Sequence, residues 1–285
     1  MKLVAYEYED HAGLGVWQGD HVIDLASLTL LADARSFIYG GPESWQEARR
    51  MVEDGQGRSV PIEAVRLRAP ITNPQKIIAI GLNYMDHIRE QKGVVPERPL
   101  VFAKFPSAII GPGDAICWDP QVTAQVDLEV ELGVVIGRQA KNVPLAEALD
   151  YVFGYTVLND VSARDLQYSD KQWVRAKSLN TFCPIGPVIV TADEIPDPQN
   201  LKIKSSINGF VMQDSTTHEM IFGVRELIAD LSRFFVLEPG DIIATGTPDG
   251  VGVFRKPQIF LKDGDHVVVE IEGIGRLENV ARFIS

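Results

Sequence analysis

Apolar and polar residues alternate over short stretches of the chain beyond residue 70, and this pattern predicts a β-rich protein. Period-two alternation is typical of strands, because successive side chains point to opposite faces. Gly, Pro and Asp separate the stretches, as expected for turns between strands. The predicted strands are KIIAIGLN (76–83), LVFAKF (100–105), VDLEVELGVVIG (126–137), VFGYTVLNDV (152–161), GPVIVTA (186–192), LKIKSSINGF (201–210), DIIATGT (241–247) and HVVVEIEGIG (266–275).

Helical patterns beyond residue 70 are few, and the first seventy residues look different from the rest. The predicted helices are MDHIREQKG (85–93), PLAEALDY (144–151) and VRELIADLSRFF (224–235). Nearer the N-terminus, short strands at 2–9, 14–20 and 21–27 precede helices at 31–41 and 43–55. Prolines and a change of composition follow near Pro70. We therefore expect an α+β, β-rich fold, with a small N-terminal α/β domain at 1–70 and a roll- or barrel-like domain at 71–285.

The charge balance argues against two classes of partner. Asp and Glu outnumber Lys and Arg by 39 to 27, which gives a net charge of −12. Because no basic surplus exists to neutralise phosphates, we expect neither a nucleic acid nor an anionic membrane as partner. A small anionic substrate is compatible with the sequence if positive charge is concentrated at its site.

Cysteine usage and hydropathy give an expectation about location. The two cysteines, Cys117 and Cys183, form no CxxC pair, so a disulfide framework or a zinc knuckle is not expected. The N-terminal stretch lacks an apolar run of signal length, and no run reaches the 18 apolar residues of a membrane span. These features favour a reducing, cytoplasmic location.

The stretch VDLEVELGVV, residues 126–135, places three acids on one face of a predicted strand. They are Asp127, Glu129 and Glu131, and their mutual repulsion needs an explanation. One interpretation is the solvated face of an edge strand. The other is a buried strand, because it continues into the apolar LGVVIG. Buried carboxylates need a cation or a proton, and a divalent metal ion would supply the charge.

A further acid could complete such a site. The apolar run VFGYTVLN ends at Asp160, where a strand-end carboxylate could meet the acids of a neighbouring strand. Asp160 could equally cap a helix that begins in VSARDLQ. Three carboxylates with water favour Mg²⁺ or Mn²⁺, and Ca²⁺ is also compatible. The five histidines are scattered, so zinc is not expected.

Other residues suggest catalysis or anion binding. His87 and Glu90 stand at i, i+3, where a carboxylate could orient an imidazole as a general base, unless they merely touch on a surface helix. Cationic, amide and hydroxyl groups could hold an anionic substrate, although such residues are often simply solvated or part of a turn. They are Arg164, Gln167, Lys177 and Thr247.

Taken together, the motifs resemble the fumarylacetoacetate hydrolase superfamily. The matching stretches are GLNYMDHIRE, VDLEVELGVVIG, GYTVLNDVSARDLQ, RAKSLNTFCPIGP, INGFVMQDSTTHEMIF and LEPGDIIATGTPDGVG, in this order from about Lys76 to Leu277. The resemblance implies a mixed β-roll or β-sandwich catalytic domain, a homodimer and one divalent metal.

The resemblance also implies roles for individual residues. It assigns the metal ligands to Glu129, Glu131 and Asp160, and it identifies His87 and Glu90 as a dyad on a segment that closes over the site. The remaining assignments concern substrate or cavity contacts. They are Arg164, Gln167, Lys177 and Thr247, with Tyr84 and Lys104 at the cavity wall.

The activity expected from this resemblance is hydrolysis of a C–C bond in a 2,4-dioxo acid of the acylpyruvate type, with a 2-oxo acid as product. In this mechanism His87 activates water and Lys177 stabilises an enolate. The same enolate serves an oxaloacetate-type decarboxylase or an isomerase, so both are alternatives. A non-catalytic module that binds a 2-oxo acid is an alternative of a different class.

Overall fold

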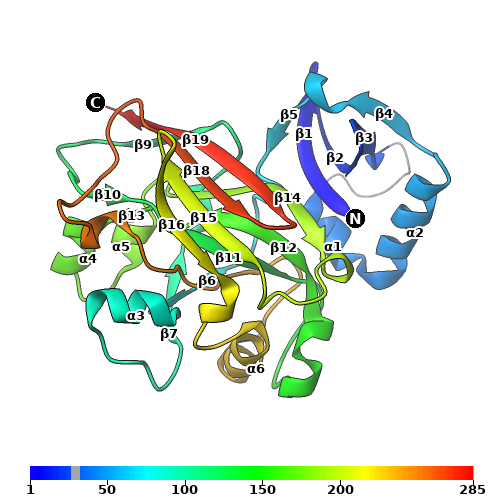
Figure 1. The fold of residues 1–285 in the computed structure, drawn as a ribbon. Coiled ribbons are helices and arrows are strands. Elements are labelled where there is room, and N and C mark those ends of the chain that lie inside the picture. The colour runs from blue at the N-terminus through cyan, green and yellow to red at the C-terminus, as the bar shows by residue number, and fades with distance from the viewer. Residues whose placement is uncertain (27–32, 285) are drawn as a thin grey trace.

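The structure is a computed structural model that describes residues 1–26 and 33–284, and it is built mainly from strands (Figure 1). Within these residues the strands form a twelve-stranded sheet, a five-stranded sheet and a two-stranded ribbon. Helices lie at the ends and sides of this framework. The predicted α+β, β-rich fold is confirmed.

The large sheet runs in the order β4-β3-β2-β1-β14-β12-β11-β17-β6-β7, with β5 paired to β1 and β8 paired to β14. Its strands are β1 (Lys2–Tyr8), β2 (His11–Gln18), β3 (His21–Asp24), β4 (Arg58–Pro61), β5 (Arg66–Arg68), β6 (Ile77–Gly81), β7 (Leu100–Lys104), β8 (Ile109–Ile110), β11 (Val130–Ile136), β12 (Val152–Asn159), β14 (Cys183–Thr191) and β17 (Ile242–Ala244).

The five-stranded sheet packs against the centre of the large sheet, as Figure 1 shows for β15, β18 and β19. Every residue of β11, β12 and β14 is buried, because these strands lie inside this sandwich. Val157, Val188 and Val269 belong to one core cluster that joins the two sheets. The smaller sheet contains β9 (Ala115–Trp118), β15 (Lys202–Ile207), β16 (Phe210–Thr216), β18 (His266–Ile271) and β19 (Gly275–Phe283), and the ribbon pairs β10 (Val126–Asp127) with β13 (Ser162–Ala163).

The helices are short, and several occur at the ends of strands. The α-helices are α1 (Ala34–Tyr39), α2 (Gly41–Glu53), α3 (Met85–Gln91), α4 (Arg164–Ser169), α5 (Val174–Lys177) and α6 (Val224–Phe234). The 3₁₀ helices are η2 (Ile62–Ala64), η3 (Pro106–Ala108), η4 (Leu145–Tyr151), η5 (Ala192–Glu194), η6 (Thr217–Glu219) and η7 (Gly252–Phe254). Over the described ranges, no helix has the length and apolar character to span a membrane.

The N-terminal segment is joined to the rest of the protein through the large sheet. Strand β1 pairs antiparallel with β14, with Leu3 opposite Ile189. The domain boundary near Pro70 stays a prediction, since this one sheet extends on both sides of it. The predicted strand 21–27 and helix 31–41 partly fall on residues 27–32, which lie outside the described residues; β3 and α1 account for the remainder.

The predicted strand 126–137 is interrupted, which corrects the sequence analysis. Backbone groups at the break bond to side chains instead of a neighbouring strand. The Leu128 amide donates to the Asp127 carboxylate at 2.9 Å, and the Glu129 amide donates to the Asn159 side chain at 3.0 Å. The chain therefore changes sheets here: β10 pairs with β13, whereas β11 lies between β12 and β17.

Two smaller predictions also need correction. Segment 144–151 forms the 3₁₀ helix η4 in place of the expected α-helix. The predicted strand 241–247 ends at Ala244, and beyond it Thr245 and Thr247 direct their hydroxyl groups to the carbonyl oxygens of Leu132 and Val130 in β11.

Replacing Leu132 with Ala should destabilise the protein by about 2–5 kcal/mol, because it leaves a cavity beneath β11 in the central core. Urea unfolding of wild type and variant would measure this difference in the free energy of unfolding. Val94→Ala is the matched control, since Val94 is 88% exposed. Equal stability of the two variants would contradict the central role of this core.

Candidate metal centre and active site

Strands β11 and β12 bring the three predicted carboxylates together. Val130 is opposite Asn159 in the strand register, and the Asp160 amide donates to the Glu129 carbonyl at 2.9 Å. Glu129, Glu131 and Asp160 each offer a carboxylate oxygen, and these oxygens lie within 4.8 Å of one another. All three side chains are buried.

Two alternatives drawn from the sequence are therefore wrong. The acids do not line a solvated edge, because β11 is an interior strand of the large sheet. Asp160 is not a helix N-cap, because α4 begins at Arg164 with Ala163 as its cap. Strand geometry, and not capping, explains the position of Asp160.

Buried cations surround the carboxylates from three other elements. Lys177 of α5 donates to Glu129 Oε2 at 2.7 Å and to Asp160 Oδ2 at 2.8 Å. Lys104 of β7 donates to Asp160 Oδ1 at 2.6 Å and also to the Lys177 carbonyl. Arg164 Nη1 lies 2.6 Å from Glu129 Oε1. The cluster therefore consists of alternating opposite charges inside the protein.

Within this cluster, Glu131 is the carboxylate without a cation. Its Oε2 accepts a hydrogen bond from the Gly246 amide at 2.9 Å, but it makes no ion pair with any residue that the structure describes. Together with Asp127, which pairs with Arg164, the cluster has four buried carboxylates and three buried cations. One negative charge is thus left in excess.

The pKa shifts follow from this imbalance. Burial raises the pKa of Glu131 well above its usual range, and the neighbouring Asp160 and Glu129 raise it further. Burial also opposes ionisation of Glu129, but Lys177 and Arg164 overcome it and lower its pKa to about 2. Although burial works against its charge, Asp160 and Glu129 raise the pKa of Lys177, so this side chain stays cationic.

The donor set fits a divalent cation that prefers oxygen. Carboxylate oxygens suit Mg²⁺, Mn²⁺ or Ca²⁺, and each carboxylate oxygen here can accept a second interaction besides its present one. A divalent ion would also convert one excess negative charge into one excess positive charge. The hydroxyl of Tyr84 is buried and lacks a hydrogen-bond partner in the described part of the chain; burial raises its pKa, and the nearby Glu131 raises it further.

A cavity of about 160 Å³ adjoins this cluster. It brings together seven of the predicted site residues: His87, Glu129, Glu131, Arg164, Gln167, Lys177 and Thr247. The other lining residues are Ile80, Gly81, Leu82, Gln91, Phe102, Tyr168, Trp173 and Phe254. Tyr84, Glu90, Lys104 and Asp160 are not part of this lining, so the placement of Tyr84 against substrate stays a prediction.

Helix α3 presents His87 to the cavity. His87 Nδ1 lies 3.3 Å from Glu90 Oε2, and the ring centroid lies 5.7 Å from that of Phe254. The Gly250 amide donates to Glu90 Oε1 at 3.1 Å. The imidazole is buried, so His87 does not lie on a solvated helix face, and its role as a general base stays a prediction.

The remaining predicted residues are partly engaged by the protein itself. Arg164 donates to Gln167 Oε1 at 3.0 Å. This bond engages the side-chain oxygen of Gln167, and its amide nitrogen can still donate to a ligand. The Thr247 hydroxyl donates to the Val130 carbonyl at 3.0 Å and accepts from Gln213 at 2.7 Å. Thr247 therefore has little capacity left for a substrate.

Comparison with known proteins identifies the family. The family model described as "Fumarylacetoacetate (FAA) hydrolase C-terminal" matches residues 76–282, which is more than half of the chain. The chain belongs to the fumarylacetoacetate hydrolase family. The resemblance found in the sequence motifs is therefore confirmed, and the carboxylate cluster lies within the matched region of this fumarylacetoacetate hydrolase family member.

Relatives within the family cover the whole chain. The oxaloacetate tautomerase fahd2 of Xenopus laevis, named as mitochondrial, is 45% identical over 287 residues, which is 98% of this chain and 89% of that protein. The structure of a fumarylacetoacetate hydrolase from Exiguobacterium antarcticum is 38% identical, with a TM-score of 0.90 and full coverage of both chains. A maleylpyruvate hydrolase from Sphingobium sp. SYK-6, in complex with manganese(II) and pyruvate, is 31% identical, with a TM-score of 0.82 and full coverage of both.

Sequence reasoning missed the aromatic wall of the cavity. Phe102 and Trp173 pack edge to face with ring centroids 5.4 Å apart, and Lys177 Nζ lies 5.2 Å from the Phe102 centroid. The proximity of Trp173 to Lys177 in sequence was a signal, whereas the contact with Phe102 joins segments far apart along the chain. Sequence reasoning also missed Gln213, which donates to the Thr247 hydroxyl. Gln213 lies in one of the matching motifs, but no pattern of charges in the sequence singles it out.

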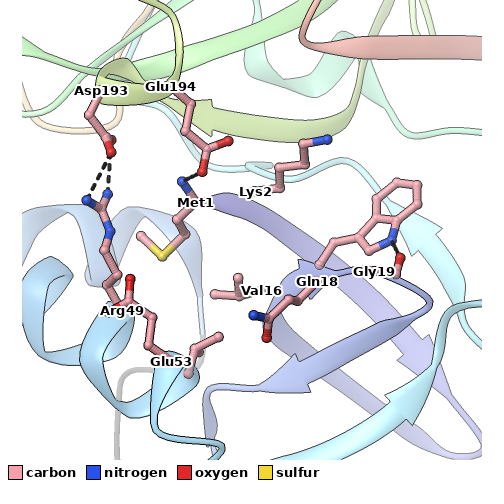
Figure 2. Close-up of a pocket in the computed structure, with 11 residues that line it drawn as sticks. Met1, Lys2, Val16, Gln18, Gly19, Arg49, Glu53, Asp193 and Glu194 are labelled. Carbon is pink, nitrogen blue, oxygen red and sulfur yellow. Dashed lines mark hydrogen bonds and ion pairs between the residues drawn. The ribbon is translucent and has the colours of Figure 1, made fainter.

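A second cavity, of about 400 Å³, lies where the start of β1 meets α2 and η5 (Figure 2). The Met1 amino group pairs with Glu194, and Arg49 Nη1 lies 2.9 Å from Asp193 Oδ2. These charges neutralise each other in pairs. Although this cavity is larger, the unbalanced charge at Glu131 places the candidate site beside β11.

Glu131→Gln should make the metal-free protein more stable and remove its response to metal. The change deletes a buried uncompensated charge, and about 1 kcal/mol corresponds to a rise of about 2–4 °C in Tm for a protein of this size. Because the folded-state pKa of Glu131 is raised, the metal-free wild type should lose stability as pH rises above the ordinary value of 4.5, and the variant should not.

Thermal unfolding with and without Mn²⁺ would measure both effects. Wild type should gain Tm with Mn²⁺ by mass action, whereas Glu131→Gln should show little gain. The control is Glu63→Gln, because Glu63 is exposed in the N-terminal segment. A full Mn²⁺ response in Glu131→Gln would contradict the assignment of Glu131 as a ligand.

Proposed function

We propose that this protein is a metal-dependent tautomerase that interconverts the enol and keto forms of oxaloacetate. The observation that carries the proposal is the buried carboxylate cluster with one excess negative charge, which adjoins a cavity lined by Lys177 and Arg164. The 45% identity to a protein named oxaloacetate tautomerase, over 98% of this chain, supports the choice of substrate.

The size and charge of the cavity suit a short 2-oxo diacid. Its volume of about 160 Å³ equals the liquid volume of about five water molecules, which is compatible with a four-carbon acid. A divalent ion, held by Glu129, Glu131 and Asp160, would supply a Lewis acid and a charge sink for the substrate oxygens. Arg164 and Gln167 lie at the same cavity and can orient a carboxylate.

The residues of this chain supply proton transfer and electrostatic stabilisation. Lys177 stays cationic and can stabilise negative charge that develops on the 2-oxo oxygen. His87, oriented by Glu90, can move a proton to or from the carbon next to the carbonyl. Tautomerisation requires these functions and no second substrate.

A second candidate is the C–C bond hydrolysis of a 2,4-dioxo acid that the sequence analysis favoured. The His87–Glu90 pair supports it, because such a pair could activate water. The structural likeness to a maleylpyruvate hydrolase supports it as well. The higher identity to the named tautomerase leads us to rank hydrolysis and oxaloacetate decarboxylation second. The homodimer and the cytoplasmic location stay predictions.

The first test measures the rate at which enol-oxaloacetate is converted to the keto form. The loss of enol absorbance reports this rate. Chelator treatment should abolish the enzymatic rate, and Mg²⁺ or Mn²⁺ should restore it. Parallel assays should measure hydrolysis of acylpyruvates and release of CO₂ from oxaloacetate. Tautomerisation should be the fastest of the three reactions.

Free metal ions also promote enolisation, so Glu131→Gln at the same metal concentration is the baseline. Full activity of thoroughly chelated wild type would exclude the metal-dependent mechanism. Faster hydrolysis of an acylpyruvate would replace the tautomerase with the second candidate. Binding of oxaloacetate without any turnover would favour the non-catalytic module.

His87→Ala should lower kcat for oxaloacetate tautomerisation by about 10²–10⁴-fold, because it removes the candidate general acid or base. The matched control is His218→Ala, since His218 is exposed on η6. Steady-state kinetics at saturating Mn²⁺ would give kcat for both variants. If His87→Ala retains a nearly normal kcat, the proton is moved by another group.

A further inference from the structure

Asp127 belongs to the same sequence motif as the candidate ligands and to the same buried charge cluster, yet it is not one of the three carboxylates that could hold a metal ion. It lies in β10, opposite Ser162 of β13, and it is buried. The metal-ligand group contains Glu129, Glu131 and Asp160 but not Asp127. A buried acid two residues from a ligand therefore needs a different explanation.

Backbone amides hold the Asp127 carboxylate in one orientation. Oδ1 accepts from the amides of Leu128 and Gly252, both at 2.9 Å, and Oδ2 accepts from the Val253 amide at 3.1 Å. A side chain at Gly252 would prevent this approach, because its Cβ would lie 1.8 Å from the Ile259 carbonyl oxygen and 2.7 Å from Asp127 Oδ1. The carboxylate is thus fixed before any ligand binds.

The fixed carboxylate pairs with Arg164. Arg164 Nε donates to Asp127 Oδ2 at 3.0 Å, and Nη2 lies 2.8 Å from the same oxygen. On its other side, Arg164 Nη1 lies 2.6 Å from Oε1 of Glu129. One buried guanidinium is therefore shared between Asp127, which is not a candidate ligand, and Glu129, which is.

This sharing affects the metal because a cation bound at Glu129 must coexist with the positive charge of Arg164. Asp127 neutralises Arg164 from the far side and restrains it there. Without the Asp127 charge, Arg164 would interact more strongly with Glu129 and would oppose a metal ion at short range.

We propose that Asp127 is a positioning residue that holds Arg164 and keeps Glu129 available to a divalent cation. The inference rests on the metal site of the proposed function. It adds a determinant of metal affinity that touches neither the metal nor the substrate. Changes to such outer partners typically cost about 10–100-fold in metal affinity.

The test is the Mn²⁺ affinity of the intact protein, measured by titration calorimetry for a set of variants. Asp127→Asn keeps Oδ1 as an acceptor for the amides of Leu128 and Gly252, but it removes the charge that faces Arg164 and the acceptor of the Val253 amide. It should weaken Mn²⁺ binding by about 10-fold or more. Saturating Mn²⁺ should then restore most of its kcat.

Asp165→Asn is the matched control for the loss of a carboxylate. Asp165 also accepts from two backbone amides, those of Ala124 and Leu166, but among the described residues it forms no hydrogen bond or ion pair with Arg164. Its Mn²⁺ affinity should stay within about 2-fold of wild type. A similar loss in both variants would show that local structure, and not the pairing with Arg164, sets the affinity.

Arg164→Gln gives a result of opposite sign and does not depend on the folding of Asp127→Asn. Removal of the guanidinium should leave Mn²⁺ affinity equal to wild type or tighter, and adding Asp127→Asn to it should cause no further weakening. General damage to the site would weaken binding in every variant. Weaker binding by Arg164→Gln would overturn the inference.

Failure of the inference and failure of the proposed function have different results. Wild type that does not bind Mn²⁺ would refute the metal site itself. Wild type that binds Mn²⁺, together with Asp127→Asn that binds equally well, would refute only the role of Asp127.

Discussion

The active centre depends on an imbalance of charge that the protein keeps away from water. Four acids and three bases are buried together, and Glu131 is the acid that has no ion-pair partner among the described residues. Burying an unpaired carboxylate is unfavourable, so the folded chain has a strong thermodynamic reason to bind a cation or a proton there. Glu131 lies in the interior strand β11, whose residues are all buried, so its carboxylate has no short path to solvent.

The two halves of the site have different structural origins. The register between β11 and β12 brings the carboxylates together, and packing of the two sheets holds this register in place. The other groups that line the cavity come mainly from short helices and loops, including α3, α4, α5 and the segment around Gly250. Loops change more easily than a buried register. This division explains how similar structures can carry the names of a tautomerase and of a maleylpyruvate hydrolase.

The sequence predicted the parts of the protein that local patterns determine. Alternation identified most strands, and the strand-end position of Asp160 correctly suggested its proximity to Glu129 and Glu131. The break at Leu128 was missed because the Asn159 side chain replaces a ladder hydrogen bond, and alternation carries no sign of that replacement. The wall formed by Phe102 and Trp173 was missed because it is a long-range contact. The reaction could not be fixed, since one enolate-stabilising centre serves several chemistries.

The pairing of β1 with β14 limits how this protein can be shortened. Strand β14 contributes to the central core, and its outer hydrogen-bonding edge is covered near Ile189 by the first strand of the chain. A fragment that starts near residue 70 would leave this edge open, next to buried apolar side chains. Open edges of this kind promote association with other chains. By pairing with β14, the N-terminal segment therefore covers an edge that could otherwise pair with another chain.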